Sequence, residues 1–530
     1  MQVRTRLNRR EFLAAMGFTA AAVSIPGCSA RSGKRPNVVV IYTDDQEFNQ
    51  LGCYGGKVLT PHMDGLARDG IKFHRYYASS PVCSPSRYNV LTGRYAGHCR
   101  NLQKLYPAGE PAFIRWNTDL LPGEQTIAHT MKRNGYVTGM AGKFHLFDNE
   151  AVQQDNPPDA DPNDREVKAR IKANYEMFQA YVRDVAGFDY AESIYANNLH
   201  ALALPKVLQE HNQEWITKGA LDFIERYRDK PFFFYMATTI PHGPVPLESM
   251  KADERITPAG YLDEAPNVQP SRGSVLERTR KAGVYDTMAP LTWLDDGVGA
   301  VLQKLDDCGL AENTLVILAS DHGSARGKMT CYESGAKAPC IIRWPGKIGE
   351  GQDNSDLVSN IDIAPTILDA CGIEHPRNVH IDGMSLMPVI RGGKIKWRDS
   401  LYLEVVYSRG VVTKDWKYIA VRFPKDVQAQ ITAANRKEFN QEGARFSSKS
   451  ITGPLAVRYN ADKDFPGYFD DDQLYNIADD PAEQVNLAGD PKYAGKLEEM
   501  KQKLKKYSKN LPHAFGEFKE EGQDGPHSFT

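Results

Sequence analysis

The sequence lacks the features of several protein classes. It has no internal repeat, which excludes a solenoid or a propeller, and no apolar run of the roughly 20 residues that a membrane-spanning helix needs. Its net charge of -2 at pH 7 gives no reason to expect a nucleic acid or an anionic membrane as a partner. The 530 residues, 41% hydrophobic and 25% charged, indicate a globular protein of two or three domains.

Cysteine follows no metal-binding pattern. The eight cysteines include no C-x-x-C pair and no Cys/His cluster with zinc spacing. One or two disulfides could form in an exported chain, but the sequence does not give their pairing. Cys83 stands apart, because it lies between prolines in "PVCSPSRYNVLTGR", with a hydroxyl and a guanidinium close behind. A core thiol, half of a disulfide, a nucleophile and the precursor of another group are all open interpretations.

The first thirty residues have the composition of an export signal. A basic start precedes a short apolar run at 13–25, which is too short for an anchor helix. The Arg9-Arg10 pair resembles a bacterial twin-arginine signal. Cys28 ends a segment similar to a lipoprotein processing site, although it could also be discarded with the signal. We predict an export signal at 1–30 and a periplasmic location, or attachment to the outer membrane through a lipid on Cys28.

Between residues 36 and 395, apolar runs alternate with stretches of helical spacing. Strands rich in Val, Ile and Phe with little alternation are typical of a sheet buried on both faces. We therefore expect an α/β catalytic domain over 36–395, with a large, mostly parallel sheet covered by helices on both faces. The expected strands are 37–43, 136–141, 231–239, 314–320 and 338–345, and the expected helices are 124–134, 213–228 and 288–307.

The pattern changes at about residue 396. Residues 400–423 predict antiparallel strands around a turn near Ser408–Gly410, and a charged helix is expected at about 491–508. We expect a smaller C-terminal α+β domain over 396–530 that contains an antiparallel sheet.

Chemically capable side chains directly follow four of the expected strands. In open α/β sheets, ligands bind beyond the carboxyl ends of the strands. One such residue alone is ordinary, but four strand ends together predict one convergent site. The residues are Asp44 and Asp45, Lys143 and His145, His242, and Asp321 with His322, and Lys328 lies a little further on.

These residue types predict a metal-assisted oxyanion site. Buried carboxylates repel one another and need a cation, and oxygen ligands favour Ca²⁺ or Mg²⁺, while His322 leaves room for another divalent ion. Lys143, Lys328 and Arg87 would add fixed positive charge for a sulfate or a phosphate. His145 and His242 are the natural proton carriers. The alternative for Asp44-Asp45 is a turn or a helix cap, and for each lysine a surface charge.

The segment from Cys83 to Arg94 resembles the signature C-x-P-S-R-x-x-x-L-T-G-R of the formylglycine-dependent type I sulfatases, in the alkaline phosphatase superfamily. Four further blocks follow in the order of that family, over about residues 36–505. They are "GYVTGMAGKFH" (135–145), "PHGP" (241–244), "SDHG" (320–323) with "KMTCYE" (328–333), and "LYNIADDPAEQVNLA" (474–488). The resemblance implies an alkaline phosphatase-like fold.

The resemblance also implies a nucleophile and its metal. Cys83 would be converted by a formylglycine-generating enzyme to Cα-formylglycine, whose hydrate attacks sulfur. The metal, usually Ca²⁺ in this family, would be bound by Asp44, Asp45, Asp321, His322 and the converted Cys83. Asparagine is more common in the family at the position of His322, which leaves the strength of that ligand open.

The remaining roles follow by position in the motifs. Arg87 would steady the diol, and Lys143 and Lys328 would hold the sulfate oxygens. His242 would protonate the leaving oxygen, and His145 would assist collapse of the diol.

The resemblance therefore predicts a sulfuric ester hydrolase that acts on a sulfated carbohydrate. A phosphate or phosphonate monoester hydrolase of the same superfamily is the main alternative, because the two anions share their shape. A non-catalytic carbohydrate-binding relative would require a lost nucleophile or ligand, and every matched position here carries a competent residue.

Overall fold

The computed structural model describes residues 35–323, 325–393, 396–445 and 461–520. The predicted export signal and Cys28 lie outside these residues. Within them, no helix is long and apolar enough to cross a membrane. The seven cysteines in this part of the chain are all free thiols, so none of the disulfides that we considered forms among them.

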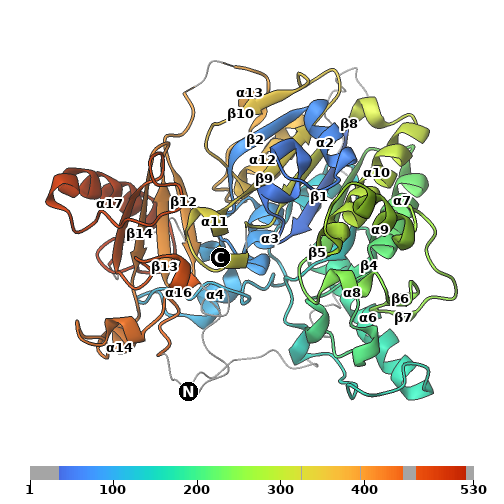
Figure 1. The fold of residues 1–530 in the computed structure, drawn as a ribbon, viewed down its shortest axis with the longest axis horizontal. Coiled ribbons are helices and arrows are strands. Elements are labelled where there is room, and N and C mark those ends of the chain that lie inside the picture. The colour runs from blue at the N-terminus through green and yellow to red at the C-terminus, as the bar shows by residue number, and fades with distance from the viewer. Residues whose placement is uncertain (1–34, 324, 394–395, 446–460, 521–530) are drawn as a thin grey trace.

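A nine-stranded sheet forms the centre of the molecule (Figure 1). Its order is β10-β2-β9-β8-β1-β5-β3-β4, and β11 also pairs with β2. The five expected apolar runs all form strands of this sheet. Its members are β1 (Asn37–Asp44), β2 (Ile71–Tyr77), β3 (Val137–Lys143), β4 (Tyr190–Tyr195), β5 (Phe232–Pro241), β8 (Thr314–Ser320), β9 (Lys337–Arg343), β10 (Gln352–Asn354) and β11 (Val358–Ser359).

The sheet is mostly parallel, as predicted. Only β9 runs against its two neighbours, β8 and β2, among the described strand pairs of this sheet. Every residue of β1 and of β8 is buried. Because successive side chains of a strand point to opposite faces, both faces of the centre of the sheet are covered.

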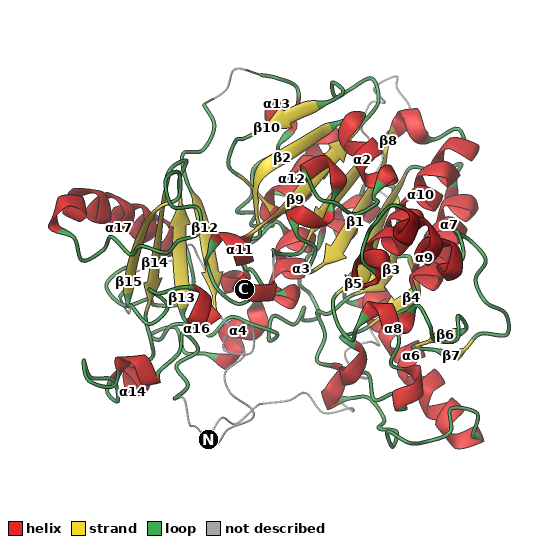
Figure 2. Cartoon of the chain, viewed as in Figure 1, coloured by secondary structure: helices red, strands yellow, loops and turns green. Residues whose placement is uncertain are grey.

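Helices surround this sheet (Figure 2). Helix α7 packs on β3, β4 and β5, and α2 packs on β2 and β9. The expected helices form as α5, α7 and α10, but α5 begins at Ile127 rather than at 124, because the Thr126 side chain caps it by accepting from the His129 N–H. The helices are α2 (Pro61–Arg68), α3 (Cys83–Thr92), α4 (Arg100–Leu105), α5 (Ile127–Arg133), α6 (Arg165–Asp184), α7 (Gln213–Tyr227), α8 (Pro246–Ser249), α9 (Arg272–Lys281), α10 (Ala289–Asp307), α11 (Glu333–Ala336), α12 (Ile363–Ala370), α13 (Met387–Ile390), α14 (Lys425–Gln428), α16 (Ala461–Asp464) and α17 (Ala494–Ser508).

The C-terminal region contains the expected antiparallel sheet. Its strands are β12 (Leu401–Val405), β13 (Ser408–Val412), β14 (Trp416–Val421) and β15 (Asp472–Asn476), in that order, and α17 packs on β13 and β14. Figure 2 shows this sheet beside the larger one. A two-stranded pair, β6 (Ile256–Thr257) and β7 (Gly260–Tyr261), lies elsewhere.

The turn predicted near Ser408–Gly410 is wrong, because these residues open strand β13. The turn lies at Val406 and Tyr407, between the paired Val405 and Ser408. Val406 leaves the ladder because its N–H and C=O bind the backbone of Ile114, and its φ is 43°. A long-range backbone pair thus decides the position of the turn.

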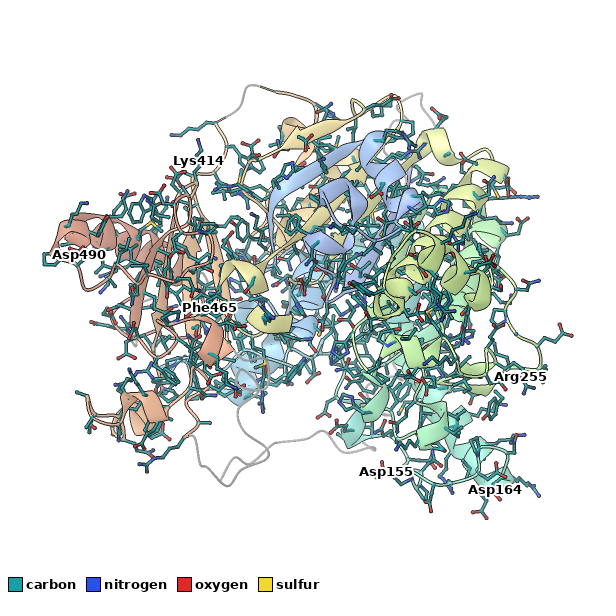
Figure 3. The ribbon with its side chains drawn as sticks, in the orientation of Figure 1. Asp155, Asp164, Arg255, Lys414, Phe465 and Asp490 are labelled. Atoms are coloured by element: carbon teal, nitrogen blue, oxygen red, sulfur yellow. The ribbon has the colours of Figure 1, made fainter. Side chains whose placement is uncertain are left out.

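Specific contacts join the C-terminal region to the region that contains the large sheet. The ring of Phe465 stacks on Tyr332 at 3.8 Å between centroids and an interplanar angle of 11°, and Figure 3 shows Phe465 at the boundary of the two regions. The carboxylate of Glu404, on β12, accepts the Gly97 N–H at 2.9 Å. These contacts fix the C-terminal region against the segments that contain Tyr332 and Gly97.

Candidate active site

Helix α3 places Cys83 at its first residue. All ten of its residues are buried, and Gly93 ends the helix in the left-handed region, at a φ of 68°. The Ser86 hydroxyl lies 2.7 Å from the Tyr42 hydroxyl and donates to the backbone oxygen of Asp321. The helix carrying Cys83 is therefore fastened to β1 and to the end of β8, and the partial positive charge of its N-terminus favours a thiolate.

The strand ends bring the predicted metal ligands around this cysteine. One ligand atom each from Asp44, Cys83, Asp321 and His322 lies within 4.8 Å of the others, and the same holds for Asp44, Asp45, Cys83 and His242. The register explains this convergence, because β1 lies between β5 and β8 and is parallel to both. Asp45 adopts a φ of 67°, and its N–H donates to Asp321 at 3.0 Å.

Three basic side chains compensate the carboxylates. Lys143 lies 2.5 Å from Asp44, Arg87 lies 3.2 Å from Asp321, and Lys328 lies 2.8 Å from Asp45. Arg87 also donates to the backbone oxygen of Lys143 at 2.9 Å, which links the helix to the end of β3. The arrangement places fixed positive charge on several sides of the Cys83 side chain.

Glycine is required where β3 delivers Lys143. Gly142 has a φ of 91°, and a Cβ added there would lie 1.7 Å from the backbone oxygen of Ala237. The same position marks a shift in the pairing of β3 with β4. The close approach of β5 at this point lets Lys143 turn toward Asp44.

The charges shift the titration of the cysteine and of one carboxyl. Burial alone would raise the pKa of the Cys83 thiol, but Lys143 and Lys328 hold that pKa well below its usual value. Burial raises the pKa of Asp321 to about 7, and the neighbouring Asp44 adds to this effect. The site therefore favours an anion at residue 83.

The two histidines differ in their state. Burial lowers the pKa of His145 to about 3, with Lys143 contributing, so the ring is neutral near pH 7. The pKa of His242 is raised above its usual value. Burial opposes this rise, and the negative charge of Asp45 favours it. The Nδ1 of His242 lies 2.8 Å from the Gly243 oxygen and its Nε2 lies 4.0 Å from Asp45. His242 is thus suited to give a proton from Nε2, and His145 to accept one.

Most side chains of the site are buried. Cys83, Asp44 and Asp321 are fully buried, whereas the side chains of Asp45 and His242 are each 15% exposed. Among the predicted site residues, these two therefore mark the side from which a substrate can reach the centre.

Sequence reasoning missed two polar residues of this region. Asn198 accepts from the Lys143 ammonium at 2.6 Å, and it follows β4, a strand whose mixed polarity hid it. His211 lies 3.0 Å from the Pro244 oxygen and 2.8 Å from the Thr239 hydroxyl, so it holds the loop that carries His242. A strand-end search that included β4 would have found Asn198, but no local signal marks His211.

The donor set fits a divalent cation. Asp44 Oδ1 is buried and makes no hydrogen bond. The Arg87 guanidinium lies 3.6 Å from this oxygen, and two further carboxylates and an imidazole lie beside it. A buried acceptor without a donor is costly, and carboxylate oxygens are the ligands that Ca²⁺ and Mg²⁺ prefer.

Comparisons with known proteins agree with this geometry. The Sulfatase family model matches residues 36–373, and a model described as N-sulphoglucosamine sulphohydrolase, C-terminal, matches residues 321–433. The chain is 30% identical to steryl-sulfatase of Rattus norvegicus over 69% of this chain and 72% of that protein. It is 26% identical to an ulvan-active sulfatase of Formosa agariphila, over 88% and 78% respectively.

Solved structures share the fold. One, described as bound to its substrate D-glucosamine-2-N,6-O-disulfate, has a TM-score of 0.57 at 21% identity, over 90% of this chain and 98% of that one. Another, the phosphonate monoester hydrolase of Agrobacterium radiobacter, has a TM-score of 0.56 at 20% identity, over 89% and 95%. The family match over most of the chain and the alkaline phosphatase-like fold agree, and the chain is therefore an enzyme that belongs to the type I sulfatases.

Proposed function

We propose that this sulfatase hydrolyses sulfate esters of a carbohydrate, with formylglycine made from Cys83 as nucleophile and Ca²⁺ as the metal. The observation that carries the proposal is the fully buried Cys83 between a carboxylate cluster and the ammonium groups of Lys143 and Lys328. A site of this charge pattern binds a compact oxyanion and activates a group held at residue 83.

The metal site would consist of Asp44, Asp45, Asp321, His322 and the converted residue 83. When bound, the divalent ion would neutralise these carboxylates and favour the ionised form of the nucleophile. The hydrated aldehyde would offer one oxygen for attack on sulfur and a second hydroxyl whose deprotonation releases sulfate from carbon.

The chain's own residues would act around that centre. Arg87, held by Asp321 at 3.2 Å, would orient residue 83. Lys143 and Lys328 would hold the sulfate oxygens. His242 would give the proton on Nε2 to the leaving oxygen, and the neutral His145 would take the proton of the second hydroxyl.

The carbohydrate substrate is inferred from several sources together. The relative named an ulvan-active sulfatase and the structural neighbour bound to a sulfated glucosamine support a sugar as the alcohol. Export to the periplasm, or to the outer membrane through Cys28, would bring the enzyme to such polymers. A formylglycine-generating enzyme would act on the unfolded chain before export, and we expect no nucleic acid partner.

The test is production in a host that contains the modifying enzyme, followed by mass analysis of the peptide that carries Cys83. We expect the mass of the aldehyde, and turnover of an aryl sulfate with loss of activity in Cys83→Ala. A panel of sulfated mono- and oligosaccharides would identify the sugar. An unmodified, inactive thiol would favour the non-catalytic carbohydrate-binding alternative.

The second candidate function is phosphonate or phosphate ester hydrolysis. The observation that favours it is the fold that this chain shares with a phosphonate monoester hydrolase. Matched aryl sulfate and aryl phosphonate esters, compared by kcat/KM, separate the two. A preference for the phosphonate would overturn the first proposal.

A further inference from the structure

A second cluster of metal-ligating side chains lies at the other end of helix α3. His98, His380 and Asp382 each offer one ligand atom, and these atoms lie within 4.8 Å of one another. The helix runs from Cys83 to Thr92, and at 1.5 Å per residue its ends are about 14 Å apart. The cluster is therefore distinct from the site around Cys83.

One carboxylate oxygen faces both imidazoles. Asp382 Oδ1 lies 2.8 Å from His380 Nε2 and 3.6 Å from His98 Nε2. The other oxygen, Oδ2, accepts the Tyr95 N–H at 2.8 Å, so the backbone fixes the orientation of the carboxylate. The centroids of the two imidazole rings lie 4.7 Å apart.

The simplest interpretation, a His380–Asp382 ion pair, leaves His98 unexplained. Its Nε2 is buried and makes no hydrogen bond, and its side chain is 13% exposed. Buried polar atoms are rarely left unpaired. The 3.6 Å from this nitrogen to Asp382 Oδ1 is too long for a hydrogen bond.

We propose that His98 Nε2, His380 Nε2 and Asp382 Oδ1 bind a divalent transition ion, of which Zn²⁺ fits best. Two imidazoles and one carboxylate suit Zn²⁺ better than Ca²⁺, which prefers oxygen ligands. With metal–ligand distances of about 2.1 Å, tetrahedral ligands lie about 3.4 Å apart. The two measured separations from Asp382 Oδ1, 2.8 and 3.6 Å, lie on either side of that value.

The ion would fasten the end of the helix that carries Cys83. The Gly93 oxygen, at the C-terminal cap of α3, accepts the N–H groups of Asp382 and Gly383 at 2.9 and 3.1 Å. His98 lies six residues after Thr92, the last residue of α3, and the adjacent Gly97 donates its N–H to Glu404 of the C-terminal sheet. An ion that joins His98 to Asp382 therefore links three segments that meet at this cap, and its binding is expected to stabilise the fold.

The test uses the full chain without a polyhistidine tag. Metal-free enzyme is saturated with Ca²⁺, titrated with Zn²⁺, separated from free ion and analysed for zinc and for its thermal midpoint. We expect the wild type to bind one more equivalent of zinc than His98→Ala or His380→Ala, and to gain thermal stability that these variants do not gain. Co²⁺ in place of Zn²⁺ should give visible d–d bands that both variants lose.

Two controls separate this site from others. His74→Ala removes a histidine outside the cluster, which pairs with Asp353 at 2.5 Å, and this variant should keep the full zinc content. Asp44→Asn weakens the site around Cys83 and should also keep the zinc that depends on His98. His98→Gln and His380→Gln replace the alanine variants if those do not fold. Equal zinc content and equal Co²⁺ spectra in the wild type and the His98 and His380 variants would overturn the proposal.

Discussion

The ammonium of Lys143 lies 2.5 Å from the carboxylate of Asp44, and both side chains are only 1% exposed. Asn198 accepts a second hydrogen bond from the same ammonium at 2.6 Å. In a buried pair, removal of one partner leaves an uncompensated charge, which costs about 3–5 kcal/mol.

Lys143→Met should therefore lower the free energy of unfolding of the calcium-free enzyme by about 3 kcal/mol, measured by urea denaturation. It should also reduce kcat/KM, because Lys143 would hold the sulfate. Lys132→Met is the matched control, since Lys132 pairs with Asp189 at 2.6 Å but is 52% exposed. An exposed pair contributes about 0–1 kcal/mol, so equal losses in the two variants would contradict the assignment.

Removal of the metal should destabilise the enzyme. Treatment with a chelator, followed by titration with Ca²⁺, should raise the thermal midpoint, because ligand at about 100 times Kd adds about 2.7 kcal/mol of stability. Activity should return along the same titration. Asp321→Asn removes a fully buried carboxylate of the cluster and should weaken the response. If the chelator changes neither the thermal midpoint nor the activity of the wild type, the result would argue against a calcium site.

Acid should destabilise the protein partly through His211. Burial lowers the pKa of His211 from 6.5 to about 4, although the hydrogen bond of the ring to the Pro244 oxygen opposes this shift. As the pH falls, the imidazole of His211 is therefore protonated in the unfolded chain before it is protonated in the folded protein. The stability that the neutral ring contributes is complete above pH 6.5 and is lost as the pH falls toward 4. The loss amounts to about 3 kcal/mol.

His211→Gln supplies the comparison, because glutamine can still donate to Pro244 and accept from Thr239 without titrating. Urea denaturation between pH 7 and pH 4 should show a shallower fall of stability in the variant than in the wild type. Parallel curves would mean that His211 makes no contribution to this pH dependence.

Gly142→Ala should be far more harmful than an ordinary glycine substitution. Gly142 and Gly55 have nearly equal φ values, 91° and 89°, but a Cβ on Gly142 meets the Ala237 oxygen at 1.7 Å, whereas one on Gly55 meets nothing within 4 Å. Gly55→Ala should thus show the conformational cost alone, about 1–2 kcal/mol. We expect Gly142→Ala to lose more stability and also activity, since it displaces Lys143. Similar thermal midpoints for the two variants would refute the role of the close approach.

Lys417 forms a buried link between the C-terminal sheet and the segment that contains Lys328. It lies 2.7 Å from Glu333 and 3.1 Å from Glu483, and Glu483 also accepts the Glu333 N–H at 2.6 Å. Lys417→Met leaves two carboxyl groups facing each other and should cost about 3–5 kcal/mol.

The control for Lys417 is Lys501→Met, because Lys501 pairs with Asp472 at 3.0 Å but is 25% exposed. That variant should lose no more than about 1 kcal/mol. Both values are measured by urea denaturation at pH 7, and a small loss in Lys417→Met would show that the buried link contributes little.

Much of the catalytic region could be inferred from local pattern. Runs such as Val38–Ile41 and Leu315–Ala319 are apolar throughout, which is typical of a strand covered on both faces. Once those strands are known, the polar residues that follow them must lie at one edge of a parallel sheet. The same logic failed for β4, since Glu192 and Ser193 interrupt its apolar pattern, and Asn198 was lost with it.

Composition and order along the chain determined five strands of the large sheet, the family motifs and the candidate site residues, because each depends on side chains that are close in sequence. Tertiary structure alone decided the reversed direction of β9, the turn at Val406 and the meeting of His98 with His380. The physical reason is that each of these depends on partners far away in the chain. Strand direction and side-chain proximity result from the packing of the whole sheet, and no local window of residues contains that information.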